Sequence, residues 1–157
     1  MIRNAQPEPD PTTATLPVLL LHLGAESYAL PGAAVREVMR YRPPLPVPGA
    51  PACLPGLISQ RGAVVPVADL RPLLQLDVTP PSKATRYIVA QHDDVTLAII
   101  ADSVSDLAEL PELALEPLPT GFNPLRARLL RATARHSGRL LALLDLEAIV
   151  ATLQNTD

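Results

Sequence analysis

The sequence predicts a mainly β protein made of two similar small β-barrels that pack together. Several short apolar segments are separated by close turn signals, a pattern typical of small barrels. A shift of 76 residues (138 minus 62) places Gly62 on Gly138 and Asp69 on Asp145, which indicates an internal repeat. Hydrophobic residues make up 48% of the 157 residues and aromatic residues only 3%, so the core must consist of Leu, Val, Ile and Ala. Each half alone is too small for an ample core, which favours mutual packing.

The first unit is expected at about residues 17–79 of one domain that spans residues 17–157. Residues 1–16 are rich in Pro and Thr, and we expect them to form a disordered tail. Residues 18–23 and 27–30 predict a β-hairpin around a Gly24 turn. A short helical segment is expected next, because Val35, Val38 and Met39 recur at i, i+3 and i+4.

The central stretch, residues 48–71, predicts two strands joined by a tight turn. Its entry is held extended by three prolines, since proline fixes φ and removes a backbone donor: Pro48, Pro51 and Pro55. We expect the turn at Arg61-Gly62, where glycine permits the chain to reverse. Asp69 has the short acceptor side chain that caps the first turn of a helix, here residues 70–74.

The second unit is expected at about residues 80–153, after a polar link at residues 77–83 that contains Pro80-Pro81. It repeats the order of the first unit. The predicted elements are a hairpin of 86–91 and 95–101, a cap or short helical segment at 102–105, a proline-punctuated loop at 107–122, strands at 129–135 and 139–144, and a helix from Asp145 to about Leu153.

Composition and motifs argue against several classes of function. The net charge of −3 and the scarcity of aromatic residues disfavour nucleic-acid binding. No apolar run reaches the roughly 18 residues that span a membrane, and a single cysteine fits a reducing cytosol. No catalytic, metal-binding or cofactor-binding motif is legible, because Cys53 has no neighbouring histidine and the three histidines are isolated: His22, His92 and His136. We therefore expect no enzyme, no metal and no cofactor.

Two arginine features leave alternatives open. Five arginines lie within residues 126–139, and one interpretation is a docking surface for phosphate or for an acidic partner. The other, which is favoured, is a solvated strand face on which some arginines pair with acids of the preceding loop: Glu109, Glu112 and Glu116. Arg61, in its turn, is either an interface anchor or the partner of an acid in its own barrel, such as Glu37.

From about Pro17 to Leu153, the sequence motifs of the chain resemble those of the CheW-like chemotaxis coupling proteins. The matching residues are Val35-Arg36-Glu37-Val38, Pro48-Gly49-Ala50-Pro51, Gly56, Arg61-Gly62, Pro66-Val67 and Asp69-Leu70-Arg71, with Ile100 to Val104 and Leu143-Leu144-Asp145 in the second half. Ala132 occupies a position that is often glycine in the family. The resemblance implies two intertwined SH3-like five-stranded barrels with strand exchange between them.

The same resemblance implies a non-enzymatic cytoplasmic adaptor of bacterial chemosensory arrays, recruited to membrane-associated receptors. Its expected partners are the cytoplasmic tip of a chemoreceptor and the regulatory domain of a CheA-type histidine kinase. Carried over by position, Val35 and Ile88 are apolar contacts in a groove between the barrels, and Glu37 and Arg61 are polar anchors at its edge. Two alternatives remain: a CheW-like scaffold of a pilus-motility or other chemosensory system, and a small β-barrel that binds a ligand or RNA.

Overall fold

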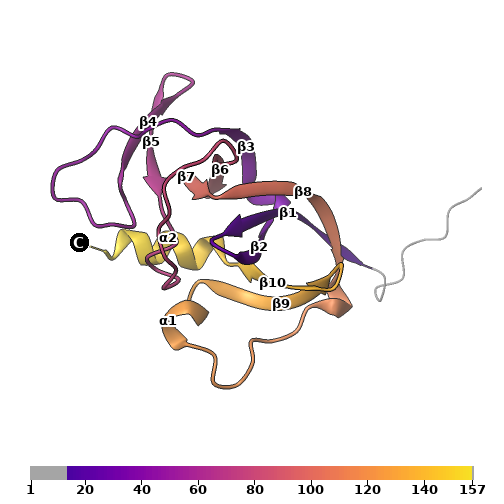
Figure 1. Cartoon of the computed structure of the whole chain (residues 1–157). Helices are drawn as coiled ribbons and strands as arrows, with labels where there is room; N and C mark the ends of the chain where they lie inside the picture. The colour runs from indigo at the N-terminus through magenta and orange to yellow at the C-terminus, as the bar shows by residue number, and fades with distance from the viewer. Residues whose placement is uncertain (1–13, 157) are drawn as a thin grey trace, which may run out of the picture.

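The computed structural model describes residues 14–156, and this part of the chain is mainly β (Figure 1). The first half contains β1 (Thr15–Leu23), β2 (Glu26–Pro31), the 3-10 turn η2 (Gly32–Ala34), β3 (Val35–Arg40), β4 (Gly56–Gln60) and β5 (Ala63–Ala68). The second half contains β6 (Arg86–His92), β7 (Val95–Ala101), β8 (Ser103–Pro111), η3 (Glu112–Ala114), α1 (Pro124–Ala127), β9 (Leu130–His136), β10 (Arg139–Leu144) and α2 (Leu146–Gln154).

The strands form two five-stranded sheets, and each sheet takes strands from both halves of the chain. The first sheet has the order β8-β1-β2-β10-β9 and the second the order β3-β6-β7-β5-β4. In chain order, β1 to β5 of the first half correspond to β6 to β10 of the second. Exchanging each strand for its counterpart converts the strand order of the first sheet into that of the second. The parallel pairs β2–β10 and β7–β5 are also counterparts. The repeat seen in the sequence is therefore a repeat of topology, in which the hairpin of each half lies in the other half's sheet.

Each sheet is rolled. In the second sheet, β3 and β4 stand at opposite ends of the strand order, yet the Gln60 amide donates a hydrogen bond to the Glu37 carboxylate. The inside of this roll holds a buried cluster that includes Val65, Val67 and Ala98. The inside of the first sheet holds a cluster that includes Leu141, Leu143 and Ala29, the residues equivalent to these three. Two barrel-like interiors with matching residues confirm the predicted pair of similar five-stranded units.

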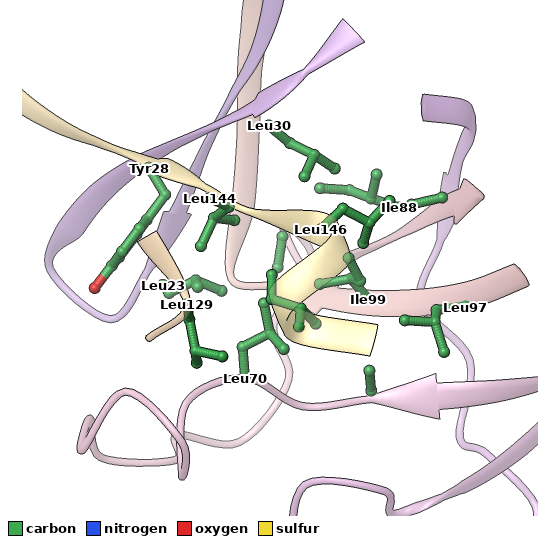
Figure 2. Packing of buried hydrophobic residues seen from close by; sticks show 14 of the residues in the cluster. Leu23, Tyr28, Leu30, Leu70, Ile88, Leu97, Ile99, Leu129, Leu144 and Leu146 are labelled. Atoms are coloured by element: carbon green, nitrogen blue, oxygen red, sulfur yellow. The ribbon is translucent and has the colours of Figure 1, made fainter. Parts of the chain in front are cut away.

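A third and larger cluster lies between the sheets and contains the buried face of α2. Figure 2 shows Leu146 of α2 among Leu30 and Leu144 from the first sheet and Ile88 and Ile99 from the second. In Figure 1, α2 lies between the β4–β5 hairpin and the β9–α1 region. The two sheets thus share one aliphatic core, because neither roll buries enough apolar surface by itself.

The structure confirms the two predicted hairpins and the final helix. It also confirms the strands on either side of Arg61-Gly62 and of Gly138. In α2 the side chain of Asp145 accepts a hydrogen bond from the Ala148 amide, 3.1 Å long, as an N-cap. The predicted turn at residues 70–74 is a single turn, with the Leu74 amide 2.9 Å from the Leu70 carbonyl. Asp69 accepts from the Arg71 amide at its start. Both cap predictions rest on a short acceptor side chain with free amides ahead of it.

Three local predictions are wrong. The predicted helical segment is the short turn η2 followed by strand β3, whose burial alternates residue by residue. Three apolar residues cannot define a helix when pairing with β6 is available, since tertiary context overrides a short pattern. Residues 103–105 and the first five residues of the predicted loop, 107–111, belong to β8 (Ser103–Pro111), which pairs with β1.

The start of the domain also differs in detail from expectation. β1 begins at Thr15, two residues before the predicted start, because Thr15 and Leu16 pair with Pro111 and Leu110. Residues 1–13 of the predicted tail lie outside the described residues. Neither helix of the described chain is long and apolar enough to cross a membrane.

Candidate functional site

The four residues predicted to bind a partner all lie in the second sheet. Val35 and Glu37 are on β3, Ile88 is on the neighbouring β6, and Arg61 is in the turn between β4 and β5. The rolling of the sheet brings the Arg61 turn against β3. Distant parts of the chain therefore meet at one corner of this sheet, as the prediction requires for Glu37 and Arg61.

Glu37 and Arg61 form an ion pair, with Arg61 Nη2 3.2 Å from Glu37 Oε1. Arg61 and Gly62 both have positive φ, 52° and 78°, which is the geometry of a tight two-residue hairpin turn. The Arg61 side chain is 79% exposed, so the pair adds less than about 1 kcal/mol to stability. The guanidinium keeps donors free for a further carboxylate or carbonyl. Of the two interpretations of Arg61, the pairing within its own unit is therefore observed, and it leaves the anchor role available.

The two apolar residues of the prediction face inward. Ile88 is fully buried in the core between the sheets, and Val35 is half-buried against the same core. A docked partner cannot touch Ile88 unless the sheet opens. Ile88 instead fixes the position of β3, since it pairs with Val38 in the ladder.

An exposed valine that the sequence reasoning missed, Val64, lies beside the ion pair, and a second, Val38, lies on the opposite face of β3 from Glu37. Val64 lines an open hollow of about 440 Å³ together with Glu37, Gln60, Arg61 and Val89. Val64 is 68% exposed and Val38, next to Glu37 on β3, is 40% exposed. The alternation of residues 63–68 could have marked Val64 as outward-facing. The helical interpretation of residues 32–39 concealed Val38, because it placed this residue on a buried stripe.

A buried ionic network fixes the chain that follows β5. Arg71 donates to both carboxylate oxygens of Asp69, at 2.9 Å from Nε and 2.9 Å from Nη2. Its Nη1 lies 2.9 Å from Oδ1 of Asp102, at the junction of β7 and β8. Asp102 in turn accepts from the Gly24 amide in the β1–β2 turn, at 2.6 Å. The hydrogen bonds to Asp69 raise the pKa of Arg71 above its ordinary value, so the charge is permanent. The network ties the two sheets together.

The first sheet has an equivalent hollow with different chemistry. Its volume is about 260 Å³, and it is lined among others by Asp106, His136, Ser137 and Leu141. These residues replace Glu37, Gln60, Arg61 and Val65 of the second sheet. In the described part of the chain, Asp106 makes no ion pair, and its carboxylate accepts from the Leu107 amide. Within residues 14–156, the exposed ion pair at this corner thus occurs in the second sheet and has no counterpart in the first.

The remaining candidate groups carry no visible chemistry. Cys53 is buried, and its burial raises the pKa of the thiol, which disfavours the reactive thiolate. No three side chains among His, Cys, Asp and Glu gather in a metal-binding arrangement within residues 14–156. His22 has its Nδ1 3.2 Å from the Ser103 hydroxyl and sits in a strand, as a structural histidine does.

The arginine run lies on α1, β9 and the start of β10. Arg126 pairs with Glu26, not with the loop acids that the sequence suggested. No ion pair to Glu109, Glu112 or Glu116 occurs among the described residues. The favoured interpretation is a solvated strand face with some arginines paired to the loop acids; Arg131, Arg135 and Arg139 are exposed, but the pairing is wrong.

This architecture defines a class: a duplicated, mainly β protein with two rolled five-stranded sheets that share one core. The chain belongs to the family of CheW-like domains, whose sequence model matches residues 17–154.

The relatives span most of the chain. The Chemotaxis protein CheW of Rhizobium meliloti (strain 1021) is 27% identical over 84% of this chain and 85% of its own length. Protein PilI of Pseudomonas aeruginosa is 30% identical over 68% of this chain and 58% of its own length. The crystal structure of the scaffolding protein TtCheW from Thermoanaerobacter tengcongensis matches with a TM-score of 0.77 at 22% identity, covering 84% of this chain and 90% of that one. This last likeness bears on the fold alone.

Proposed function

We propose that the chain is a non-enzymatic adaptor that couples the cytoplasmic tips of chemoreceptors to a CheA-type histidine kinase. The observation that carries the proposal is the CheW-like family match over residues 17–154. A relative named as a chemotaxis protein and a structural neighbour described as a scaffolding protein support it. An adaptor needs binding surfaces rather than a reactive centre. The described residues offer exposed anchors of this kind.

The receptor surface is assigned to the corner of the second sheet around Glu37 and Arg61. An amphipathic receptor helix lays its apolar face against Val64, the exposed apolar residue that lines the hollow beside the ion pair. Arg61, held at the edge by Glu37, donates to a carboxylate or to the helix's terminal carbonyls. Val35 on β3 and Ile88 on the neighbouring β6 pack in the core and hold β3 in position, so their effect on binding is indirect.

The kinase regulatory domain binds a different surface, so that receptor and kinase are held at once. The adaptor works in the cytoplasm and reaches the membrane only through the receptor. It inserts no segment into the bilayer, and it requires neither a metal nor a cofactor.

The test is a calorimetric titration of a receptor cytoplasmic-tip fragment from the source organism into the full chain. The informative variant is the charge swap Glu37→Arg with Arg61→Glu, because it can restore the internal ion pair while inverting the charge offered outward. If Arg61 anchors the receptor, both Arg61→Glu and the swap weaken binding by about tenfold or more. Val64→Ser weakens binding as well. The matched control is Asp106→Ala with Ser137→Ala at the equivalent corner of the first sheet, which leaves binding unchanged.

If the swapped variant bound the receptor tip as tightly as wild type, the ion pair would have only a structural role. The proposed receptor surface around Glu37 and Arg61 would then be wrong. A folded wild-type chain that binds no receptor tip but captures another chemosensory component would favour the second candidate, a CheW-like scaffold of an alternative chemosensory system. The relative named PilI supports keeping that candidate. Co-sedimentation with the kinase regulatory domain, with and without receptor, then decides whether the chain couples two partners.

A further inference from the structure

A second hollow, on the first sheet, lies apart from the Glu37–Arg61 corner. It has a volume of about 610 Å³ and lies between α1 and strands β2, β9 and β10. Its lining includes the apolar Phe122 and Leu140, the basic Arg126 and Arg139, and one acid, Glu26, which is paired with Arg126. The proposed receptor surface uses none of these residues.

One wall of this hollow is held in place by Arg126. The guanidinium donates to the Glu26 carboxylate and to the Tyr28 hydroxyl, the latter at 2.9 Å. Its Cζ lies over the Phe122 ring, 5.8 Å from the centroid. Asn123 caps the short helix that carries Arg126 by accepting from the Leu125 amide. These contacts preform the hollow, which lowers the ordering cost of binding there.

The opposite rim offers free positive charge around an exposed leucine. Leu140 is 55% exposed, although it lies on a central strand of the sheet. Its cross-strand partner is Arg135 and its chain neighbour is Arg139, both exposed. Neither arginine makes an ion pair with any residue in the range 14–156. An apolar side chain flanked by two free guanidinium groups is thus presented to a partner.

The charge of the chain is divided between this region and the rest. Residues 122–139 contain five arginines and no acid, a local charge of +5. The whole chain has 13 Lys and Arg and 16 Asp and Glu, so the remainder has 8 basic and 16 acidic residues, a charge of −8. A negative protein with one positive region orients an acidic partner toward that region and repels it elsewhere.

We propose that this hollow docks an acidic peptide segment whose one apolar side chain packs against Leu140 and Phe122. The peptide carboxylates then pair with Arg135 and Arg139 at the rim. A protein segment fits better than a nucleic acid or an anionic bilayer for two reasons. A preformed concave hollow suits a single inserted side chain rather than the flat surface of a bilayer. Phe122 is also the one aromatic ring near the rim that is not fully buried, so stacking of successive bases has no platform.

The experiment measures fluorescence anisotropy of labelled synthetic peptides with the full chain. The first peptide set alternates glutamate and serine around one central leucine, with the number of glutamates graded. The second set replaces the leucine by serine, and the third replaces the glutamates by lysine. We expect binding only by the first set, stronger with more glutamates and weaker as salt is raised. Arg139→Glu and Leu140→Ser each weaken binding by about tenfold.

The matched controls are Arg40→Glu, an exposed arginine on the second sheet, and Val64→Ser, the position equivalent to Leu140. Both leave peptide binding unchanged, and thermal unfolding confirms that all variants fold. The proposal is overturned if no peptide of the first set binds, or if leucine and serine peptides bind alike. It is equally overturned if an oligonucleotide or a vesicle of anionic lipid displaces the peptide and binds more tightly.

Discussion

The two sheets share one strand order, yet the residues at equivalent positions do different physical work. After β5 the chain makes one turn that is locked by the buried Asp69–Arg71–Asp102 network, whereas after β10 it continues into the nine-residue helix α2. Gly56 at the start of β4 corresponds to Ala132 on β9, since each pairs with equivalent residues, Val67 and Leu143. The comparison teaches that duplication fixed the backbone and left the side chains free to specialise.

The largest expected effect comes from removing the buried charge after β5. Arg71→Ala leaves the Asp69 carboxylate buried without its partner. It also removes the hydrogen bond from the Arg71 guanidinium to the Asp102 carboxylate. We expect a loss of about 3–5 kcal/mol in the free energy of unfolding, as for other broken buried ion pairs. Urea denaturation measures it. Arg40→Ala, at an exposed site, changes stability by less than about 0.5 kcal/mol, and an equally small effect of Arg71→Ala would show that the network does not join the sheets.

Gly56→Ala tests the second difference between the sheets. A Cβ at Gly56 would stand 2.3 Å from the Leu45 carbonyl oxygen, in the backbone bridge between Leu45 and Leu57. The clash involves backbone, so we expect a loss of about 1–3 kcal/mol in stability. The reciprocal change Ala132→Gly costs at most about 1 kcal/mol, through chain entropy alone. Similar unfolding midpoints for Gly56→Ala and wild type would contradict this asymmetry.

Asp145→Ala removes the cap of α2 from the second half. The Asp145 carboxylate accepts one amide hydrogen bond and carries no buried ion pair. The expected loss is about 1 kcal/mol, the usual value for an N-cap. Asp69 occupies the equivalent place in the first half. The ratio of the losses in the free energy of unfolding caused by Asp69→Ala and by Asp145→Ala therefore measures how far the two positions have diverged. Circular dichroism with thermal unfolding provides both numbers, and equal losses would argue that capping dominates in both halves.

The smallest effect on stability is expected at the exposed corner. Arg61→Ala breaks an ion pair whose arginine is largely in solvent, so stability changes by less than about 1 kcal/mol. The equivalent Ser137→Ala changes it as little. If Arg61→Ala instead unfolded the chain, its turn would be a structural element, and its role as an anchor would lose its basis.

The sequence predicted much of the local structure because the relevant signals are short-range. Turn chemistry placed the hairpin reversal at Arg61-Gly62, and capping chemistry placed the start of α2 at Asp145. β3 was missed because three apolar residues fit a helical stripe by chance, and β8 because its acidic, half-exposed residues resemble a loop. Of the candidate site, Glu37 and Arg61 meet as predicted by their types and places. Ile88 was assigned to a groove by position in the family resemblance, and a position in the sequence does not reveal which face of its strand the sheet buries.

By itself the sequence determined the class of the fold and the repeat, since short strands, turn residues and the 76-residue spacing can be read along the chain, and its motifs carried the resemblance to the family. Only the tertiary structure decided which strands pair across the repeat and which side chains face solvent. Those outcomes depend on contacts between residues far apart in the chain. The first hairpin of each half pairs with strands of the other half, and Arg71 donates a hydrogen bond to Asp102, which is 31 residues away. The unpaired arginines beside Leu140 emerge for the same reason, because ion pairing is set by distances in space and not along the chain.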